Sequence, residues 1–348
     1  MSLLRLPPEI LMLIFDQIGS SFSREDLGRL TVCKQWLGFA LPACFKCITL
    51  SQETLRNLIT SGIIKKSFLL TNSLETIDLE LRGYQSCIFP PYSQEYAQEP
   101  NSLNATSSNE ASRDNTAKTC IKTLKNVFAQ LAIVAQQSNR LRTLRIRAWS
   151  SPEPASRPGD YLTLATMQAF LSLEKLRVLV LDLSGSFLDA SGEQGNSYHI
   201  CPAIGALLRT LRTLHLRMRS ICPDVLKPRD PDDSLHLSVV AINLSHPGIM
   251  SVTHSKQCGS RGGGVLRLKA AIQEQGEVLA TRMASPKTIR ILNHSLPQFE
   301  IQSLDVLTGK TIILDDDMAW DEDSKTVKEE SEPESEITDD GFSTFLDE

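Results

Sequence analysis

A short leucine pattern recurs along the chain and constrains its fold more than any other feature. Leucine-type residues stand at relative positions i, i+3 and i+5, and in four of the five copies also at i+7. The alternation in the second half of each copy predicts a strand with one buried face. The copies occupy residues 74–81, 141–146, 176–183, 211–218 and 237–244, and their equivalent positions are Ile77, Leu144, Leu179, Leu214 and Val240.

Apolar stripes at helical spacing precede three of these copies, at residues 118–136, 162–173 and 203–210. Repeated helix-then-strand units predict a parallel sheet in which each unit buries its face on its neighbour. The pattern resembles the strand of a leucine-rich repeat. We therefore expect an α/β fold in which residues 51–314 form an irregular leucine-rich-repeat-like helix/strand solenoid.

The irregularity shows in the spacing, since equivalent positions lie 26 to 67 residues apart, against roughly 20–29 in regular repeats. The asparagine that usually follows the strand is also missing. A generic α/β domain with several leucine-rich strands remains the alternative. Residues 84–117 are rich in Ser, Asn, Glu and Gln and poor in apolar side chains, which predicts a disordered insertion.

The first fifty residues have a different pattern, typical of short helices. Residues 7–18 carry apolar side chains on one broad face, with the Pro7-Pro8 pair suited to a helix start and Gly19 to a helix stop. Ser23 is a candidate N-cap for the next helix. An apolar face then continues from Leu27 to Pro42.

The string LPPEILMLIF, which begins at Leu6, and the string DLGRLTVCKQWLGFALPACF, which begins at Asp26, together resemble the F-box motif. The resemblance covers roughly residues 4–50 and implies three short helices that dock on a Skp-type adaptor, which a cullin scaffold holds in turn. Ile18 stands where the family often has leucine. The positions that match the family's adaptor contacts are Leu6, Pro7, Ile10, Leu11, Ile14, Phe15, Leu27, Leu30, Val32, Cys33, Trp36 and Leu37.

The size of this module supports docking independently of the resemblance. About fifty residues bury too little surface to cover apolar side chains on several faces, so a partner surface is expected. Folding back onto the chain's own carboxy-terminal part is the alternative. The resemblance implies a non-catalytic substrate-recognition subunit of a Skp–cullin–F-box ubiquitin ligase that binds an unidentified target protein through residues 51–314. An adaptor-bound scaffold that acts without cullin is the second possibility.

Charge divides the chain into two unlike parts. Its formal net charge is −5, but residues 315–348 alone carry −13, which leaves +8 on residues 1–314. We expect a disordered acidic tail over 315–348, which either keeps the chain in solution or folds back onto the basic part.

Arginines gather around two of the predicted strands and suit an acidic or phosphorylated target, unless they are ordinary solvated surface. They are Arg140, Arg142, Arg145, Arg147, Arg209, Arg212, Arg217 and Arg219.

No motif predicts catalysis, a cofactor or a metal site. Thr308-Gly309-Lys310-Thr311 lacks the preceding glycine of a phosphate-binding loop and predicts a tight turn. The Cys44/Cys47 pair has no second pair at ligand spacing, so both are expected to be packing residues. His215 is expected on the sheet surface. We expect no nucleic-acid or membrane partner.

The eight scattered cysteines, together with a start that does not resemble a signal peptide, predict reduced thiols and a cytoplasmic or nuclear location.

Overall fold

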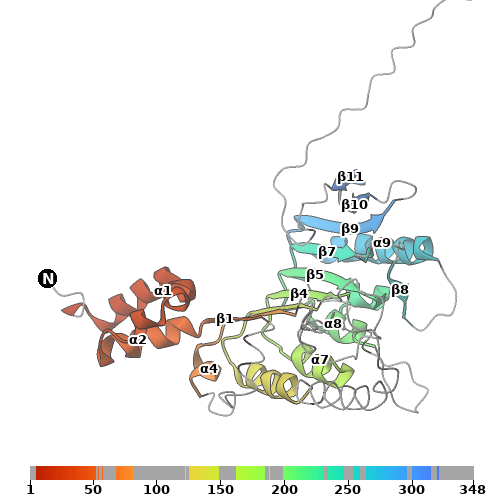
Figure 1. Cartoon of the computed structure of the whole chain (residues 1–348). Coiled ribbons are helices and arrows are strands. Elements are labelled where there is room, and N and C mark those ends of the chain that lie inside the picture. Colours follow the sequence, from red (N-terminus) through yellow and green to blue (C-terminus); the bar gives the residue numbers. More distant parts are fainter. Residues whose placement is uncertain are drawn as a thin grey trace, which may run out of the picture.

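The structure is a computed structural model, and its centre is a nine-stranded sheet in the order β1-β2-β3-β4-β5-β7-β9-β10-β11 (Figure 1). It describes residues 5–51, 54, 57, 68–81, 122, 125–148, 162–184, 188, 199–230, 234–246, 254–258, 264–295, 300–314 and 320. The predicted insertion at 84–117 lies outside these residues, as does the predicted acidic tail at 315–348 apart from Trp320. Within the described part, no helix has the length and apolar character needed to cross a bilayer.

Neighbouring strands of the sheet are parallel from β1 to β9, and the chain crosses it almost in sequence order. The prediction of a mixed α/β fold is thereby confirmed. The parallel strands are β1 Cys47–Ser51, β2 Thr76–Glu80, β3 Thr143–Arg147, β4 Val178–Leu183, β5 Thr213–Met218, β7 Val239–Asn243 and β9 Thr288–His294.

The predicted equivalence of the leucine patterns is confirmed by the strand register. Ile77 pairs with Leu144, Leu144 with Leu179, Leu179 with Leu214, and Leu214 with Val240. These side chains are fully buried. A second buried column runs two residues further along, through Leu79, Ile146, Leu181, Leu216 and Ile242.

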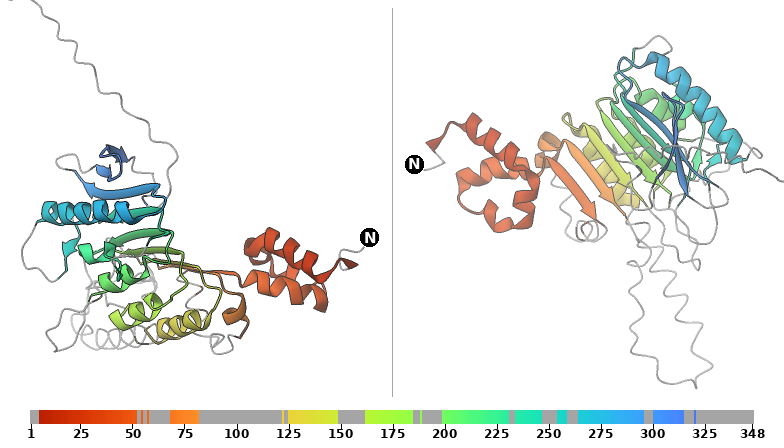
Figure 2. Two further views of the ribbon diagram at one scale, coloured as in Figure 1. Left: turned by 180° about the vertical axis from the view of Figure 1, so that it is seen from behind. Right: turned by 90° about the horizontal axis from the view of Figure 1, so that it is seen from above.

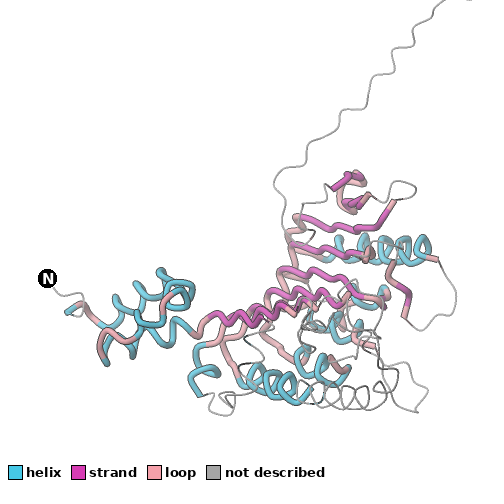
Figure 3. Tube along the Cα trace, viewed as in Figure 1, coloured by secondary structure: helices cyan, strands magenta, loops and turns pink. Residues whose placement is uncertain are grey.

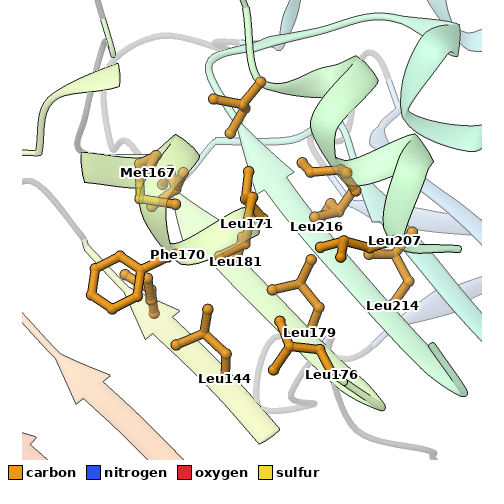
Figure 4. Packing of buried hydrophobic residues seen from close by; sticks show 14 of the residues in the cluster. Leu144, Met167, Phe170, Leu171, Leu176, Leu179, Leu181, Leu207, Leu214 and Leu216 are labelled. Carbon is orange, nitrogen blue, oxygen red and sulfur yellow. The ribbon is translucent and has the colours of Figure 1, made fainter. Parts of the chain in front are cut away.

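Helices cover the face of the sheet on which these columns lie (Figure 3). They are residues 125–137, α7 Leu164–Leu171, α8 Cys201–Leu207 and α9 Val265–Arg282. Figure 4 shows Met167, Phe170 and Leu171 of α7 packed over Leu144, Leu179 and Leu181 of the strands. One continuous hydrophobic core results, and it extends from β1 to β9. The amino-terminal module has a small core of its own, formed by Phe15, Leu30, Ala40 and Ala43.

The carboxy-terminal end of the sheet departs from the repeat. β9 pairs antiparallel with β10 Ile301–Asp305, which pairs antiparallel with β11 Thr311–Leu314. Gly309, at φ 72°, makes the tight turn between β10 and β11 that the sequence predicted at Thr308–Thr311. The 18-residue helix α9 was not predicted.

The Pro- and Asp-rich residues 219–235 and the Gly-rich residues 254–264 predict loops, but their described residues are ordered and partly buried. Within 219–235, β6 Ser220–Ile221 is followed by the 3₁₀ helix η5 Pro223–Leu226, and Val225, Leu226 and Leu235 have no exposed surface. Within 254–264, β8 Lys256–Gln257 pairs with β6. The loop prediction was wrong at these residues because low-hydrophobicity stretches still contribute single buried side chains.

The amino-terminal residues form a separate helical module that projects from the β1 edge of the sheet (Figures 1 and 2). It contains α1 Pro8–Glu25, the 3₁₀ helix η2 Leu27–Leu30 and α2 Lys34–Cys44. Gly19, at φ 76°, interrupts α1 as the sequence predicted. The expected cap at Ser23 was wrong. Asp26 caps η2 by accepting a hydrogen bond from Gly28, and Cys33 caps α2 by accepting one from Trp36.

A short joint connects this module to the sheet, since only Phe45 and Lys46 separate α2 from β1. The Lys46 carbonyl accepts hydrogen bonds from the backbone of Glu75 and Thr76, at 2.8 and 3.0 Å. The Lys46 Nζ lies 3.4 Å from an Asp16 carboxylate oxygen of α1 and 3.5 Å from one of Glu75. Lys46 therefore contacts both the module and the sheet.

Candidate functional site

The helical module carries an unusual share of exposed apolar side chains. Of the eleven exposed large hydrophobic residues in the described part of the chain, seven belong to the module. We call them the exposed apolar set: Leu6, Ile10, Met12, Leu13, Ile18, Val32 and Leu37. Single exposed apolar residues are common on protein surfaces, but seven on so small a module make it a candidate contact surface.

The twelve predicted adaptor contacts separate into three groups in the structure. Those with exposed side chains are Leu6, Pro7, Ile10, Val32 and Leu37, and those half-buried are Ile14, Cys33 and Trp36. Those buried inside the module are Leu11, Phe15 and Leu30. The side chain of Leu27 lies outside the described part. The first group is directly available to a partner.

The buried group holds the module together. Leu11 is fully buried, and Phe15 is 3% exposed. The Phe15 ring meets the edge of the Trp36 ring at a centroid distance of 4.6 Å. The Trp36 Nε1 donates a hydrogen bond of 2.6 Å to the Arg29 carbonyl. A substitution at Leu11 or Phe15 would therefore test the fold of the module rather than its surface.

A basic hollow of about 510 Å³ lies where the chain enters β3, β4, β5 and β7. Its lining residues come from the turns before these strands: Arg142, Glu174, Lys175, Arg177, Arg209, Thr210, Arg212 and His236. One carboxylate thus faces five permanently charged cations. Such an excess of cationic groups around a concave surface favours anionic groups of a partner.

The predicted arginine cluster is consequently divided in the structure. Arg142, Arg209 and Arg212 line the basic hollow. Arg145 and Arg147 stand on the sheet face opposite the helices and are half-buried, and Arg140 is exposed. Arg217 is bound within the molecule, and the Arg219 side chain donates to the Ser184 carbonyl at 2.6 Å. Only some of the eight arginines therefore share a surface, because strand alternation and strand ends separate the others.

The sheet face opposite the helices holds a buried ion pair. Arg217 on β5 makes two hydrogen bonds to Asp182 on β4, the Nε–Oδ1 bond being 3.0 Å long. The Asp182 side chain is 1% exposed. Trp320 covers this place, with its ring 5.0 Å from the Arg217 guanidinium carbon. His215 is 5% exposed and 6.5 Å from the same ring, so its predicted surface position was wrong.

Four metal-binding side chains that the sequence did not single out also come together. Their ligand atoms, from His199, Cys201, Cys222 and Cys258, all lie within 4.8 Å of one another. Hydrogen bonding from Cys201 lowers the pKa of the Cys258 thiol to about 4. Hydrogen bonds with Cys222 and then Cys258, together with burial, raise the pKa of Cys201. The one sequence signal was His199-x-Cys201, because the other two thiols stand alone in the chain. Cys44 and Cys47, the pair considered from the sequence, are half-buried and lie outside this cluster.

Comparison with known proteins adds no assignment, because no family model and no curated protein matches this chain.

Proposed function

We propose that this chain is a non-catalytic substrate receptor that docks on a Skp-type adaptor of a cullin ubiquitin ligase. The exposed apolar set carries the proposal. Burial of these apolar side chains against a partner would stabilise the complex by about 25 cal/mol per Å² of apolar surface. The resemblance of residues 4–50 to the F-box motif supplies the kind of partner. The docking contacts are the exposed family positions, chiefly Ile10, Val32 and Leu37.

The rest of the chain binds the target in this proposal. The ordered succession of parallel strands with helices on one face is compatible with a leucine-rich-repeat-like solenoid, which presents broad binding surfaces. The basic hollow is the recognition site, and it selects an acidic or phosphorylated segment of the target. Its arginines come from three successive helix–strand turns and allow bidentate contacts with carboxylate or phosphate oxygens.

The docking half is tested by co-purification of the full chain with a Skp-type adaptor. The variant Ile10→Asp/Val32→Asp places two carboxylates on side chains that are 43% and 65% exposed, so the module stays folded. We expect adaptor binding to fall at least about 100-fold, because the charges would be buried in the interface. Leu266→Asp is the matched control, since Leu266 is 78% exposed but lies on α9.

The outcomes separate two functions. Binding by the wild type and by Leu266→Asp, but not by the double variant, supports docking through the module. Cullin in the same complex supports a ligase receptor, whereas an adaptor complex that excludes cullin supports a scaffold. If the wild type binds no adaptor, the docking proposal is wrong.

The recognition half is tested with a phosphoserine peptide rich in glutamate and with its alanine counterpart. We expect the phosphopeptide to bind the wild type more tightly, with an affinity that decreases as salt increases. Arg177→Glu/Arg212→Glu should abolish this binding, whereas Arg229→Glu, outside the hollow, should not. Equal binding of both peptides by all forms would contradict the assignment of the hollow.

A further inference from the structure

The four clustered Cys and His side chains have the separations expected around one metal ion. The Cys201 and Cys258 sulfurs are 3.9 Å apart, and the Cys222 sulfur is 3.8 Å from the His199 Nδ1. Zinc binds sulfur at about 2.3 Å and nitrogen at about 2.0–2.1 Å with tetrahedral angles, so its ligand atoms are separated by roughly 3.5–3.8 Å. These two separations exceed the expected values by only a few tenths of an ångström, and all four ligand atoms lie within 4.8 Å of one another.

The fold brings these residues together from three connections on the same side of the sheet. His199 and Cys201 stand at the start of α8, after the chain has left β4. Cys222 follows β6, which continues from β5, and Cys258 follows β8, which comes after β7. The cluster therefore lies beyond the carboxyl ends of three successive strands, whereas the basic hollow lies at their amino ends. The two places are separate parts of the molecule.

Two backbone contacts fix the position of the cluster. The amide of Cys258 donates to the Ile221 carbonyl at 3.2 Å, which places Cys258 next to Cys222. Gly205 of α8 approaches η5 so closely that a Cβ atom there would lie 2.4 Å from the Lys227 carbonyl oxygen. This approach holds Cys201 beside the residue that precedes η5, Cys222. The ligand set is thus positioned by the packing of elements rather than by one mobile loop.

The chemistry of the set favours zinc held in a structural role. Three thiolates and one imidazole form a common closed zinc site, in which the protein fills all four positions. Cys201 has no exposed surface and Cys222 is 6% exposed, so water has little access to the ion. A disulfide does not describe the cluster, because the Cys201–Cys258 sulfurs are far from the bonded distance of about 2.05 Å.

We propose that His199, Cys201, Cys222 and Cys258 bind one Zn²⁺ ion that fastens α8, η5 and the β6–β8 pair to one another. The strands β6 and β8 have only two residues each and bury few side chains. The ion would supply the stabilisation that longer strands would obtain from their hydrophobic contacts. The site is independent of the docking and recognition proposals, and it adds no catalytic step.

The test is the metal content of the full chain, purified without a metal-affinity tag and measured by elemental mass spectrometry. We expect about one zinc per chain in the wild type and none in Cys222→Ser/Cys258→Ser. Cys44→Ser/Cys47→Ser removes the same number of thiols from the half-buried pair outside the cluster and should keep the zinc. Cobalt substituted for zinc should give the intense visible bands of a tetrahedral thiolate site in the wild type and in this control.

A wild-type measurement covers the case in which the cluster variant does not fold. A chelator should release one zinc, expose three further thiols to a thiol reagent and lower the Tm by several degrees. Zinc at or below the level of the cluster variant, an unchanged thiol count after chelation, or a Cys201–Cys258 disulfide in protein purified under reducing conditions would each overturn the proposal. Iron with labile sulfide in place of zinc would also overturn it.

Discussion

The helical module and the sheet distribute polarity in opposite ways. The module leaves apolar side chains such as Leu13 and Val32 exposed, at 58% and 65%. The sheet buries polar ones, among them Asp182, Arg217, Asn243 and His246. Exposed apolar groups lose little if the chain unfolds, whereas buried polar groups are costly unless their partners stay in place. A partner that covers the apolar side chains would therefore stabilise the module, whereas a local change that removes a partner of a buried polar group would destabilise the sheet.

The largest expected effect is at the buried ion pair of the sheet. Arg217→Met leaves the Asp182 carboxylate buried without its partner, which should reduce the free energy of unfolding by about 3–5 kcal/mol. Denaturant unfolding measures the change. Asp182→Leu/Arg217→Met removes both charges and should recover most of the loss. A loss below about 1 kcal/mol in the single variant would mean that the pair is solvated in solution.

A second comparison uses the same substitution in both regions. Gly205→Ala in α8 forces a Cβ atom against the backbone of η5 and should destabilise the sheet by about 2 kcal/mol. Gly38→Ala in α2 meets no atom within 4 Å. It should therefore be neutral or add up to about 1 kcal/mol, because alanine favours a helix over glycine. Thermal unfolding distinguishes the two, and the same sign for both would contradict the difference in packing.

The sheet should also be sensitive to acid through His246. Burial, with Arg219 and Arg217 nearby and His254 and His294 also contributing, lowers the pKa of His246 to about 4. The unfolded chain binds this proton near pH 6.5, so stability is present above pH 6.5 and is lost as the pH falls towards 4. About 2 kcal/mol should disappear between pH 7.5 and 5.

His246→Asn removes this contribution and should flatten the stability–pH curve over that range. His236→Asn, an exposed histidine of the basic hollow, should leave the curve unchanged. Parallel curves for the wild type and His246→Asn would show that His246 is solvated.

The smallest expected effect is on the module surface. Leu13→Gln and Val32→Gln should change the free energy of unfolding by less than about 0.5 kcal/mol, because these side chains contact little in the free chain. Leu279→Gln on α9 is the opposite case, because Leu279 has no exposed surface. This substitution should reduce the free energy of unfolding by several kcal/mol. A large loss at Leu13 would mean that the module surface is already covered within the molecule.

The recurring leucine-pattern strands could be predicted from the sequence, whereas elements that occur only once, such as helix α9, could not. The columns through Leu144, Leu179 and Leu214 could be aligned because one spacing recurs and the alternation fixes which side chains are buried. Helix α9 was missed because its buried positions, such as Leu268 and Ile272, are few and do not recur elsewhere in the chain.

The candidate sites were predictable to different degrees. The proposed docking residues follow from a local motif, but the structure divides them by burial. No spacing shows that Leu11 and Phe15 face inward while Ile10 faces outward. The metal-binding set was not predictable, because Cys222 and Cys258 are brought to Cys201 only by the pairing of β6 with β8 and the packing of α8 on η5. A ligand set assembled from three connections has no spacing motif.

In the proposed receptor, the joint at Lys46 would limit the reach of the docked chain. With two residues between α2 and β1, and Lys46 bonded on both sides, the joint has none of the slack of a flexible linker. Once the module is seated on a scaffold, the angle of the sheet, and with it the place where a target is presented, is already set. If the chain is the receptor proposed above, a rigid arm of this kind would select among the lysines of a target by their distance from the transfer enzyme. In this proposal, a longer joint would alter the choice of modified lysine more readily than the choice of target.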